Sequence, residues 1–262
     1  MSNGEERGEE MYETILVEKQ DNIAILTFNR PEQLNAVSVK LMKELCQVLR
    51  ELGSNKEIRV VIMTGVGKAF SAGFDLGSDS SLSEALEMFC SFEEEDTILN
   101  FDKPLIAAVN GHALGQGIQH ALFSDIILAS EKAKFGFWGP RIGGICHVSV
   151  WMLPLIVGRN KANELLFTCE MFDAEEAFRI GLVNKVVPHE QLMPAALEMA
   201  GKIMKNAPLS IKFTKHALMK RLLDTELKSF LSESISVLFN SEDMKEAMKA
   251  FQEKREPIFK EI

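Results

Sequence analysis

Long apolar runs, clustered basic residues and metal-ligand spacings are all missing from this sequence. No apolar stretch approaches the roughly 20 residues of a membrane span. The net charge of −9 over 262 residues argues against nucleic acid as the main partner, because phosphate contacts need gathered Lys and Arg. No GxGxxG motif joins a strand to a helix, and no cluster of His, Cys and carboxylates has metal-ligand spacing. We therefore expect no metal, flavin or nicotinamide cofactor.

Cysteine is also scarce, and the four thiols are spread along the chain at Cys46, Cys90, Cys146 and Cys169. The N-terminal residues MSNGEERGEE are polar and acidic, without the apolar segment of a signal peptide or the Arg-rich character of a transit peptide. We expect a cytoplasmic chain with reduced thiols, in which residues 1–11 form a disordered acidic tail.

Hydrophobic patterns predict an α/β fold in which strands alternate with helices. In residues 38–53 the apolar side chains mark one face of a helix. From about residue 190 onward the strand signals vanish, so we expect a core at 12–195 and a C-terminal helical region at 196–262. The expected strands are 13–18, 23–28, 60–64 and 105–109.

Two small-residue turns are the most informative local features. An apolar run leads into the glycine loop of KPLIAAVNGHALGQG at 103–117. A second turn, FSAGFDL at 70–76, follows the apolar strand at 60–64. Where such a strand ends at a helix start, the backbone N–H groups point one way and suit a developing negative charge. Two turns of this kind can supply two donors to one oxyanion.

Six motifs occur in this sequence in the order found in one protein family. They are NRPEQLNAV at 29–37, VVIMTGVGKAFSAGFDL at 60–76, KPLIAAVNGHALGQG at 103–117, SDIILASEKAKFG at 124–136, FDAEEAFRIGLVNKVVP at 172–188 and AFQEKREPIF at 250–259. On these motifs the sequence resembles the crotonase superfamily, also called the enoyl-CoA hydratase/isomerase superfamily. The resemblance implies a spiral of ββα units with a C-terminal helical region that packs between subunits. It also implies an acyl-CoA thioester as substrate, no cofactor beyond that coenzyme A, and a homotrimer or a dimer of trimers.

By this resemblance, the oxyanion donors are the backbone N–H groups of Phe74 and Gln116. Donors at these positions stabilise the enolate form of a thioester. Lys254 resembles a residue that reaches the CoA phosphates. The substrate-binding candidates are Leu34, Ala36, Ala72, Asp75, Leu76, His112, Leu114, Gly115, Trp138, Gly139, Arg141 and Lys254.

Two departures concern the glutamates with which hydratases of this family position water and move the α-proton. The first of these positions holds Gln119, and the second holds Gly139. Gln exchanges no proton near neutral pH, and Gly offers no side chain. The stretch GPRIGG at 139–144 resembles a branch of dihydroxynaphthoyl-CoA synthases and ring-opening ketoacyl-CoA hydrolases, in which the second position is also glycine.

His147 is the best candidate for proton transfer, because an imidazole serves as acid or base at neutral pH. It follows Gly143 by four residues, an offset at which some isomerase-type relatives carry a glutamate. The alternative is a buried, hydrogen-bonded histidine at a helix start. Cys146 is either a nucleophile at that helix start or a buried, inert thiol.

Several neighbouring residues also have two interpretations. Trp138 is expected to form a flat aromatic wall suited to a ring or a flat enone. Arg141 is expected to bind a substrate carboxylate or a CoA phosphate, or else to make a surface ion pair. The stretch at 78–96, with its acidic run at 93–96, is expected to be a solvated helix face or a mobile loop. The family resemblance implies the alternative that this stretch lines the acyl pocket, with Met88, Phe89 and Phe92 touching the acyl group.

We therefore predict an acyl-CoA enzyme that stabilises a thioester enolate and has non-hydratase or modified chemistry. The reactions considered are isomerisation, C–C bond cleavage or formation, and hydrolysis of a cyclic or bulky acyl-CoA. One alternative is a true enoyl-CoA hydratase in which His147 and an ordered water replace the glutamates. A third interpretation, motivated by the loss of both carboxylates, is a protein that binds acyl-CoA or serves as an assembly subunit without catalysis.

Overall fold

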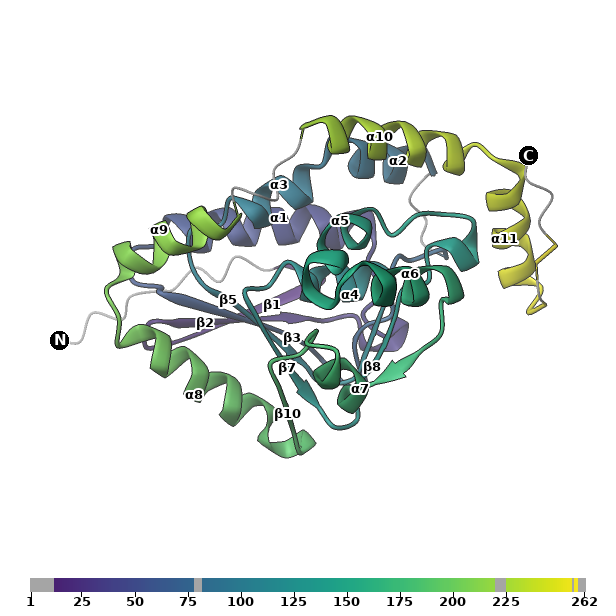
Figure 1. Cartoon of the computed structure of the whole chain (residues 1–262). Helices are drawn as coiled ribbons and strands as arrows, with labels where there is room; N and C mark the ends of the chain where they lie inside the picture. The colour runs from purple at the N-terminus through teal and green to yellow at the C-terminus, as the bar shows by residue number, and fades with distance from the viewer. Residues whose placement is uncertain (1–11, 78–81, 220–224, 256, 259–262) are drawn as a thin grey trace.

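The computed structural model describes residues 12–77, 82–219, 225–255 and 257–258 (Figure 1). The expected acidic tail at 1–11 lies outside the described residues. Strands and helices alternate along most of the chain, which confirms the predicted α/β class. After the strand at Lys185–Val187 the described elements are all helical, as the sequence predicted for the C-terminal region.

A six-stranded sheet runs through the centre of the molecule in the order β1-β2-β3-β5-β7-β10. β1 pairs with β2 in antiparallel fashion, and each further neighbouring pair is parallel. The strands are β1 Ile15–Gln20, β2 Ile23–Phe28, β3 Val60–Gly65, β5 Leu105–Val109, β7 Ile126–Ser130 and β10 Lys185–Val187. The strand predicted at 13–18 therefore begins two residues later, and the other three begin where the sequence placed them.

Both faces of this sheet are buried, which explains why its strands have continuous apolar runs. Successive side chains of a strand point to opposite faces. In β3, Val61 and Met63 join the large core under most of the helices, while Val60 and Ile62 face helix α8 (Leu192–Met204). Figure 1 shows α8 by itself on one side of the sheet. The expected domain boundary after residue 195 falls inside this helix.

A second, smaller sheet places the ends of short strands side by side. Its order is β4 (Ala69–Ser71), β6 (His112–Leu114), β8 (Lys134–Gly136) and β9 (Phe172–Asp173). β4, β6 and β8 are parallel, and each follows a strand of the large sheet along the chain. Because parallel strands end at the same edge, the turns after β4 and β6 meet there.

Helices cover the other face of the large sheet and extend beyond it. The helix predicted at 38–53 is observed as α1 at Val39–Ser54, with the Ser38 hydroxyl accepting a hydrogen bond from Leu41 N. Within the described residues, no helix is long and apolar enough to cross a membrane. The remaining helices are α2 Leu82–Ser91, α3 Glu93–Leu99, α4 Gln116–Leu122, α5 His147–Val157, α6 Arg159–Thr168, α7 Ala174–Arg179, α9 Pro208–Met219, α10 Thr225–Phe239 and α11 Glu242–Gln252.

Short 3-10 turns complete the described elements, at Pro31–Gln33, Pro140–Ile142 and His189–Gln191.

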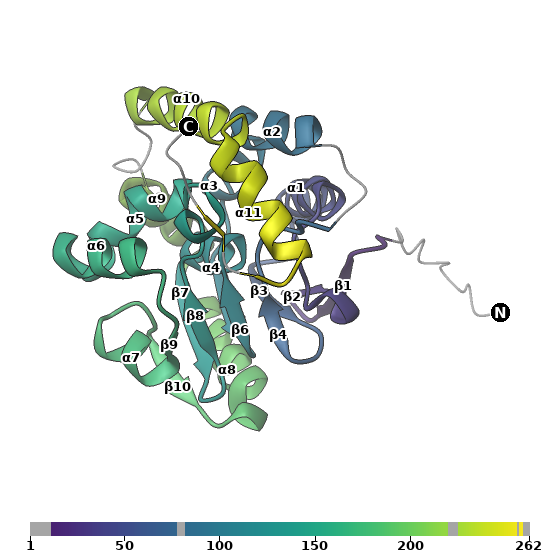
Figure 2. The same ribbon diagram turned by 90° about the vertical axis from the view of Figure 1, so that its right-hand side faces the viewer.

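The C-terminal helices do not form one bundle. In Figures 1 and 2, α10 lies beside α2, and α11 stands apart at the opposite end of the molecule from α9. The helical region thus reaches several sides of the core.

The acidic run at 93–96 corrects part of the prediction of a solvated helix face or mobile loop at 78–96, of which residues 78–81 lie outside the described residues. It forms the start of α3, in which Glu93 is exposed and pairs with Arg50. Glu94 and Glu95 are each only 2% exposed. They lie four residues before Ile98 and Leu99, which are also buried, so the apolar end of the helix turns both carboxylates inward.

One glycine controls how closely α4 approaches β4. A Cβ added at Gly117 would lie 2.3 Å from the carbonyl oxygen of Ser71. We expect Gly117→Ala to lower the free energy of unfolding by about 1–3 kcal/mol, because α4 must move off the strand. A Cβ added at Gly201 in α8 would meet no neighbouring atom within 4 Å. Gly201→Ala should therefore raise the free energy of unfolding by up to about 1 kcal/mol. Urea unfolding of both variants measures this contrast, and equal effects would contradict it.

Candidate active site

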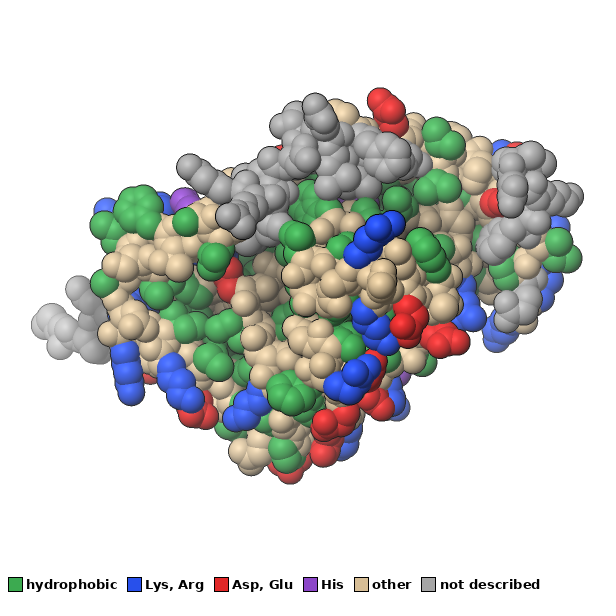
Figure 3. All heavy atoms as spheres, viewed as in Figure 1, with side chains coloured by type: hydrophobic (Ala, Val, Ile, Leu, Met, Phe, Trp, Pro, Cys, Tyr) green, Lys and Arg blue, Asp and Glu red, His purple; other side chains and the backbone are tan. Residues whose placement is uncertain are grey.

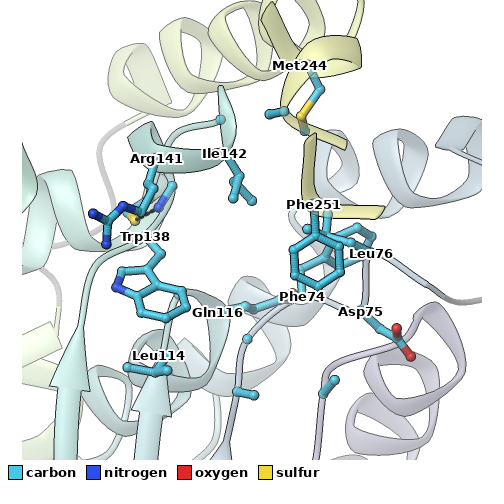
Figure 4. Close-up of a pocket in the computed structure, with 18 of the residues that line it drawn as sticks. Phe74, Asp75, Leu76, Leu114, Gln116, Trp138, Arg141, Ile142, Met244 and Phe251 are labelled. Carbon is cyan, nitrogen blue, oxygen red and sulfur yellow. Dashed lines mark hydrogen bonds between the residues drawn. The ribbon is translucent and has the colours of Figure 1, made fainter. Parts of the chain in front are cut away.

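A cavity of about 900 Å³ lies where the turns after β4 and β6 meet. Figure 4 shows Trp138 above Leu114 on one side, Phe74 and Phe251 on the other, and Gln116 between the two sides. Phe74, Gln116, His147 and all the substrate-binding candidates except Lys254 line this cavity. The structure therefore brings together residues that are far apart in the sequence.

The two turns touch each other through glycine. Gly73 has a φ of +96°, and a Cβ there would lie 2.7 Å from the carbonyl oxygen of Leu114. Gly115, with a φ of +51°, precedes the first residue of α4. Both positive φ angles favour glycine, and at Gly73 the close approach also leaves no room for a side chain. The geometry thus explains why small residues occur in both motifs.

The backbone N–H groups of Phe74 and Gln116 remain available on this edge. Val37 N donates to Gly73 O at 2.7 Å, and Asp75 N donates to Val37 O at 2.9 Å, so both neighbours of Phe74 are engaged on one side. Phe74 N points the other way along this bridge. Gln116 N is the first of α4 and has no carbonyl of its own helix to bind. Neither N–H makes a backbone hydrogen bond within the described residues.

An ion pair joins the NRPEQLNAV motif to the turn after β4. Arg30 Nη2 lies 2.8 Å from Asp75 Oδ2, and both side chains are largely buried. Arg30 also donates to the carbonyl of Ala36. The carboxylate of Asp75 is therefore engaged within the protein and holds one wall of the cavity in place.

The surroundings of Gln119 and Gly139 suit the residues that are present. Gln119 Oε1 accepts a hydrogen bond of 3.0 Å from Val148 N, so this side chain anchors the first turn of α5. A Cβ at Gly139 would lie 2.6 Å from Cys146 N and 2.8 Å from Cys146 Sγ. The loop that returns to Cys146 thus occupies the space of a side chain at position 139.

His147, the first residue of α5, lines the cavity and is held by a buried acid. Its Nε2 lies 2.5 Å from Glu95 Oε1, and the two side chains are 4% and 2% exposed. The rings of Phe89 and Phe92 pack edge-on against the imidazole, with centroids 5.5 Å and 6.0 Å away. Within the described residues its Nδ1 makes no hydrogen bond. The imidazole is therefore both hydrogen-bonded, as one interpretation held, and placed at the cavity, as the other required.

Glu94, which lies next to Glu95 in α3, holds the cavity-lining residue Gln116 in place. Its Oε2 accepts a hydrogen bond of 2.9 Å from Gln116 Nε2, and its Oε1 lies 2.9 Å from His120 Nε2. Both oxygens are therefore satisfied, which a buried carboxylate requires. His120 belongs to this packing and not to the cavity lining.

Other predicted residues occupy varied places. Trp138 forms a flat wall of the cavity, and the guanidinium of Arg141 is turned away from the space between Trp138 and Phe74 (Figure 4). Phe89 lines the cavity, whereas Phe92 is buried behind it against His147. Lys254 is not among the lining residues, and its neighbour Arg255 is.

Sequence reasoning missed the contributions of α3 and α11. Met244, Ala247 and Phe251 come from α11 and close one side of the cavity. Their spacing gives an amphipathic face in the sequence, but nothing indicates which core that face meets. Glu94 and Glu95 were detectable from their register with Ile98 and Leu99.

Two mainly parallel sheets whose paired turns expose backbone N–H groups at a large, mainly apolar cavity define a crotonase-type α/β enzyme scaffold. The sequence matches the family described as Enoyl-CoA hydratase/isomerase over residues 18–262. The chain belongs to this family, whose members process acyl-CoA thioesters.

Relatives of this chain differ in the reaction for which they are named. This chain is 40% identical over 257 residues to a short-chain-enoyl-CoA hydratase of Clostridium acetobutylicum, and the match covers 92% of this chain and 95% of the relative. A carnitinyl-CoA hydratase from Mycobacterium avium superposes with a TM-score of 0.84 at 35% identity, over 94% of this chain and 98% of the other. A methylmalonyl-CoA decarboxylase superposes with a TM-score of 0.82 at 28% identity, over 96% and 100%.

The environment of Cys146 favours the inert thiol over the nucleophile. Burial raises the pKa of Cys146 to about 12, so the thiol stays neutral at physiological pH. We expect iodoacetamide at pH 8 to leave Cys146 unmodified in the folded protein and to alkylate it in urea, as read by peptide mass spectrometry. Rapid labelling of the folded protein would show instead an accessible thiolate.

Proposed function

We propose that this protein moves a single proton on an acyl-CoA enolate, with His147 as the base and acid, and that its reaction is the isomerisation of an unsaturated acyl-CoA. One observation carries the proposal. The cavity presents an imidazole with a buried carboxylate partner, and its lining includes Gln119 and Gly139, which by the family resemblance hold the two glutamate positions of hydratases. One general base suffices for a proton shift.

In this reaction the thioester oxygen receives hydrogen bonds from Phe74 N and Gln116 N. The Cα–H bond of a β,γ-unsaturated acyl group breaks, its electron pair enters the dienolate, and the proton passes to His147 Nδ1. The imidazolium then returns a proton to the γ-carbon, and the dienolate electrons form that C–H bond. The double bond has moved to the α,β position, and the donors have stabilised the charge that developed on oxygen.

The lining of the cavity disfavours hydration by a carboxylate pair. Among the described residues of the lining, the carboxylates are Glu32 and Asp75. Asp75 is paired with Arg30, and Glu32 lies exposed on a 3-10 turn in the NRPEQLNAV motif. Hydration by two carboxylates requires one of them to act as general acid and the other as general base on the same acyl group. Glu32 and Asp75 do not form such a pair.

A true hydratase is the second candidate, and the names of the relatives favour it. The similarity to the Clostridium acetobutylicum hydratase extends over nearly the whole chain. In that reaction His147 would activate an ordered water, and the imidazolium would then supply the α-proton. The two candidates give different products from the same site, because hydration adds a water and isomerisation adds nothing.

The size and walls of the cavity support a bulky or flat acyl group. Phe74, Phe89 and Trp138 present aromatic surface to a cavity of about 900 Å³. Flat rings favour stacking or edge contact with a cyclic or conjugated acyl chain. We therefore propose such an acyl group over a short saturated one.

The test measures three products from one set of incubations in D₂O. Crotonyl-CoA reports hydration, a β,γ-unsaturated acyl-CoA reports isomerisation, and a saturated acyl-CoA reports exchange of its α-hydrogens. We expect His147→Gln to slow isomerisation and exchange by about 10²–10⁴-fold, because general acid–base catalysis contributes this much. Affinity for acyl-CoA should change little. His189→Gln is the control, since that ring binds Ser130 Oγ at 3.0 Å and does not line the cavity.

Each result separates the candidates. Fast hydration of crotonyl-CoA that depends on His147 would establish the hydratase and reject the isomerase. Acyl-CoA binding with no isomerisation, exchange or hydration would reject both and support the non-catalytic binding or assembly protein. Full activity of His147→Gln would remove this histidine from the mechanism.

Apolar side chains left exposed on several helices support the proposal of a homotrimer or a dimer of trimers. On the face drawn in Figure 3, hydrophobic side chains reach the surface between the charged ones. Exposed apolar area of this kind is costly unless it is covered. The large exposed apolar residues on α5, α6, α7, α9 and α10 are Leu155, Ile156, Phe167, Phe178, Leu209, Phe213, Leu218 and Val237.

We expect light scattering coupled to gel filtration to give the mass of three or six chains, because such an assembly covers these side chains. Phe167→Asp should shift that mass toward one chain, since a charge cannot be buried there without a partner. Glu164→Gln, an exposed neighbour on α6, is the matched control. A single-chain mass for the unmodified protein would contradict the proposal.

A further inference from the structure

We propose that Glu95 is a positioning residue that fixes the tautomer of His147 and stabilises its protonated form. The inference rests on the proposed role of His147 and adds a residue that lies outside the cavity lining. Three features of α3 and α5 carry it: the short contact between the side chains, their shared burial, and a buried oxygen of Glu95 to which no described residue donates a hydrogen bond.

The contact joins a carboxylate to one specific ring nitrogen. Glu95 Oε1 lies 2.5 Å from His147 Nε2, which is shorter than an ordinary N–H···O hydrogen bond. A carboxylate accepts, so the neutral imidazole must keep its proton on Nε2. The lone pair is then on Nδ1, the nitrogen without a hydrogen bond within the described residues. The pairing therefore presents a base to the cavity.

Burial makes the contact stronger than the same pair in water. Both side chains are almost fully buried, and the aromatic rings of Phe89 and Phe92 lie against the imidazole. When Nδ1 takes a proton, the positive charge forms next to a fixed negative one in a medium of low polarity. The carboxylate thus offsets the cost of a buried imidazolium.

The second oxygen of Glu95 distinguishes this acid from its neighbour. Glu94 uses both oxygens, on Gln116 and His120, as a structural carboxylate does. Glu95 Oε2 is buried and has no hydrogen-bond partner within the described residues. An unsatisfied buried oxygen lowers stability. An apolar residue at this position would be more stable. The presence of Glu95 therefore indicates a functional role that needs the negative charge.

Few other charges face this pair. On its own element His147 adjoins Cys146, whose thiol stays neutral because burial raises its pKa to about 12. From α4 the nearest polar groups are Gln119, which is neutral, and His120, which is bound to Glu94. From α3, Glu94 is engaged with Gln116 and His120, and among the described residues it makes no hydrogen bond to His147. Glu95 is therefore the acid that acts on His147 directly.

The first experiment needs no turnover and no variant of Glu95. In protein labelled with ¹⁵N-histidine, the signals of His147 are identified by their loss in His147→Gln. We expect the neutral ring to carry its proton on Nε2. A neutral ring protonated on Nδ1 instead would overturn the inference, whatever the enzyme catalyses, because Glu95 could then not hold it as an acceptor.

The second experiment replaces the charge and keeps the shape. We expect Glu95→Gln to lower kcat by about tenfold to a thousandfold with KM changed by less than about threefold, as when the orienting acid of a catalytic triad is neutralised. The acidic limb of the pH–rate profile should move to lower pH, because loss of the negative charge disfavours the imidazolium. Glu93→Gln, the same change on an exposed residue of α3, should alter neither.

The outcomes separate this inference from the proposed function. If His147→Gln is inactive while Glu95→Gln keeps both its rate and its pH profile, His147 remains the base and the inference fails. If His147→Gln is fully active, the proposed function fails, and the inference is then judged on NMR titration of the ring. An unchanged titration of His147 in Glu95→Gln would overturn it. If Glu95→Gln does not fold, the tautomer in the unmodified protein decides.

Discussion

The burial of two adjacent carboxylates on α3 is the constraint on which the site depends. Taking a carboxylate out of water costs several kcal/mol unless partners replace the water. Glu94 finds those partners on α4 and Glu95 on α5, so three helices are held at fixed distances by their polar contacts. Gln119 completes the set by joining α4 to the first turn of α5. Apolar side chains hold α3, α4 and α5 together. The polar contacts of Glu94, Glu95 and Gln119 fix how the three helices are aligned with one another.

The sheets supply the other half of the site. Because β4 and β6 are parallel neighbours, their turns come together without any side chain that must be drawn across. Glycine permits the close approach, and the Arg30–Asp75 pair holds the motif before α1 against the turn. The backbone donors therefore come from the rigid part of the protein. The imidazole comes from a helix whose position depends on buried acids, so the two parts of the chemistry rest on different forces.

Local patterns were enough to predict the fold class and the main elements. Apolar runs located β2, β3 and β5, and Ser38 before an amphipathic stretch located α1. The cavity residues on the two turns followed from glycine spacing and from the family resemblance. These features depend on interactions between residues near in sequence, which a sequence displays directly.

The misses arose where a residue's environment depends on a distant segment. An acidic run usually faces water, and although the register with Ile98 and Leu99 indicates burial, the partners of Glu95 and Glu94, His147 and Gln116, lie in distant segments. The contribution of α11 to the cavity depends on where a remote helix docks, which its own periodicity does not encode. Gln119 was read as the loss of an acid, whereas its amide has a task of its own at Val148 N.

The crowding around Gly139 has a consequence for the history of this protein. The loop from 140 to 145 folds back so that Cys146 fills the space of a side chain at 139, and Gly144 N binds the carbonyl of Gly139 at 2.9 Å. One substitution cannot place an acid at position 139 while this loop keeps its path, because the acid and the loop need the same space. Any evolutionary route to an acid at this position must therefore also rebuild the loop.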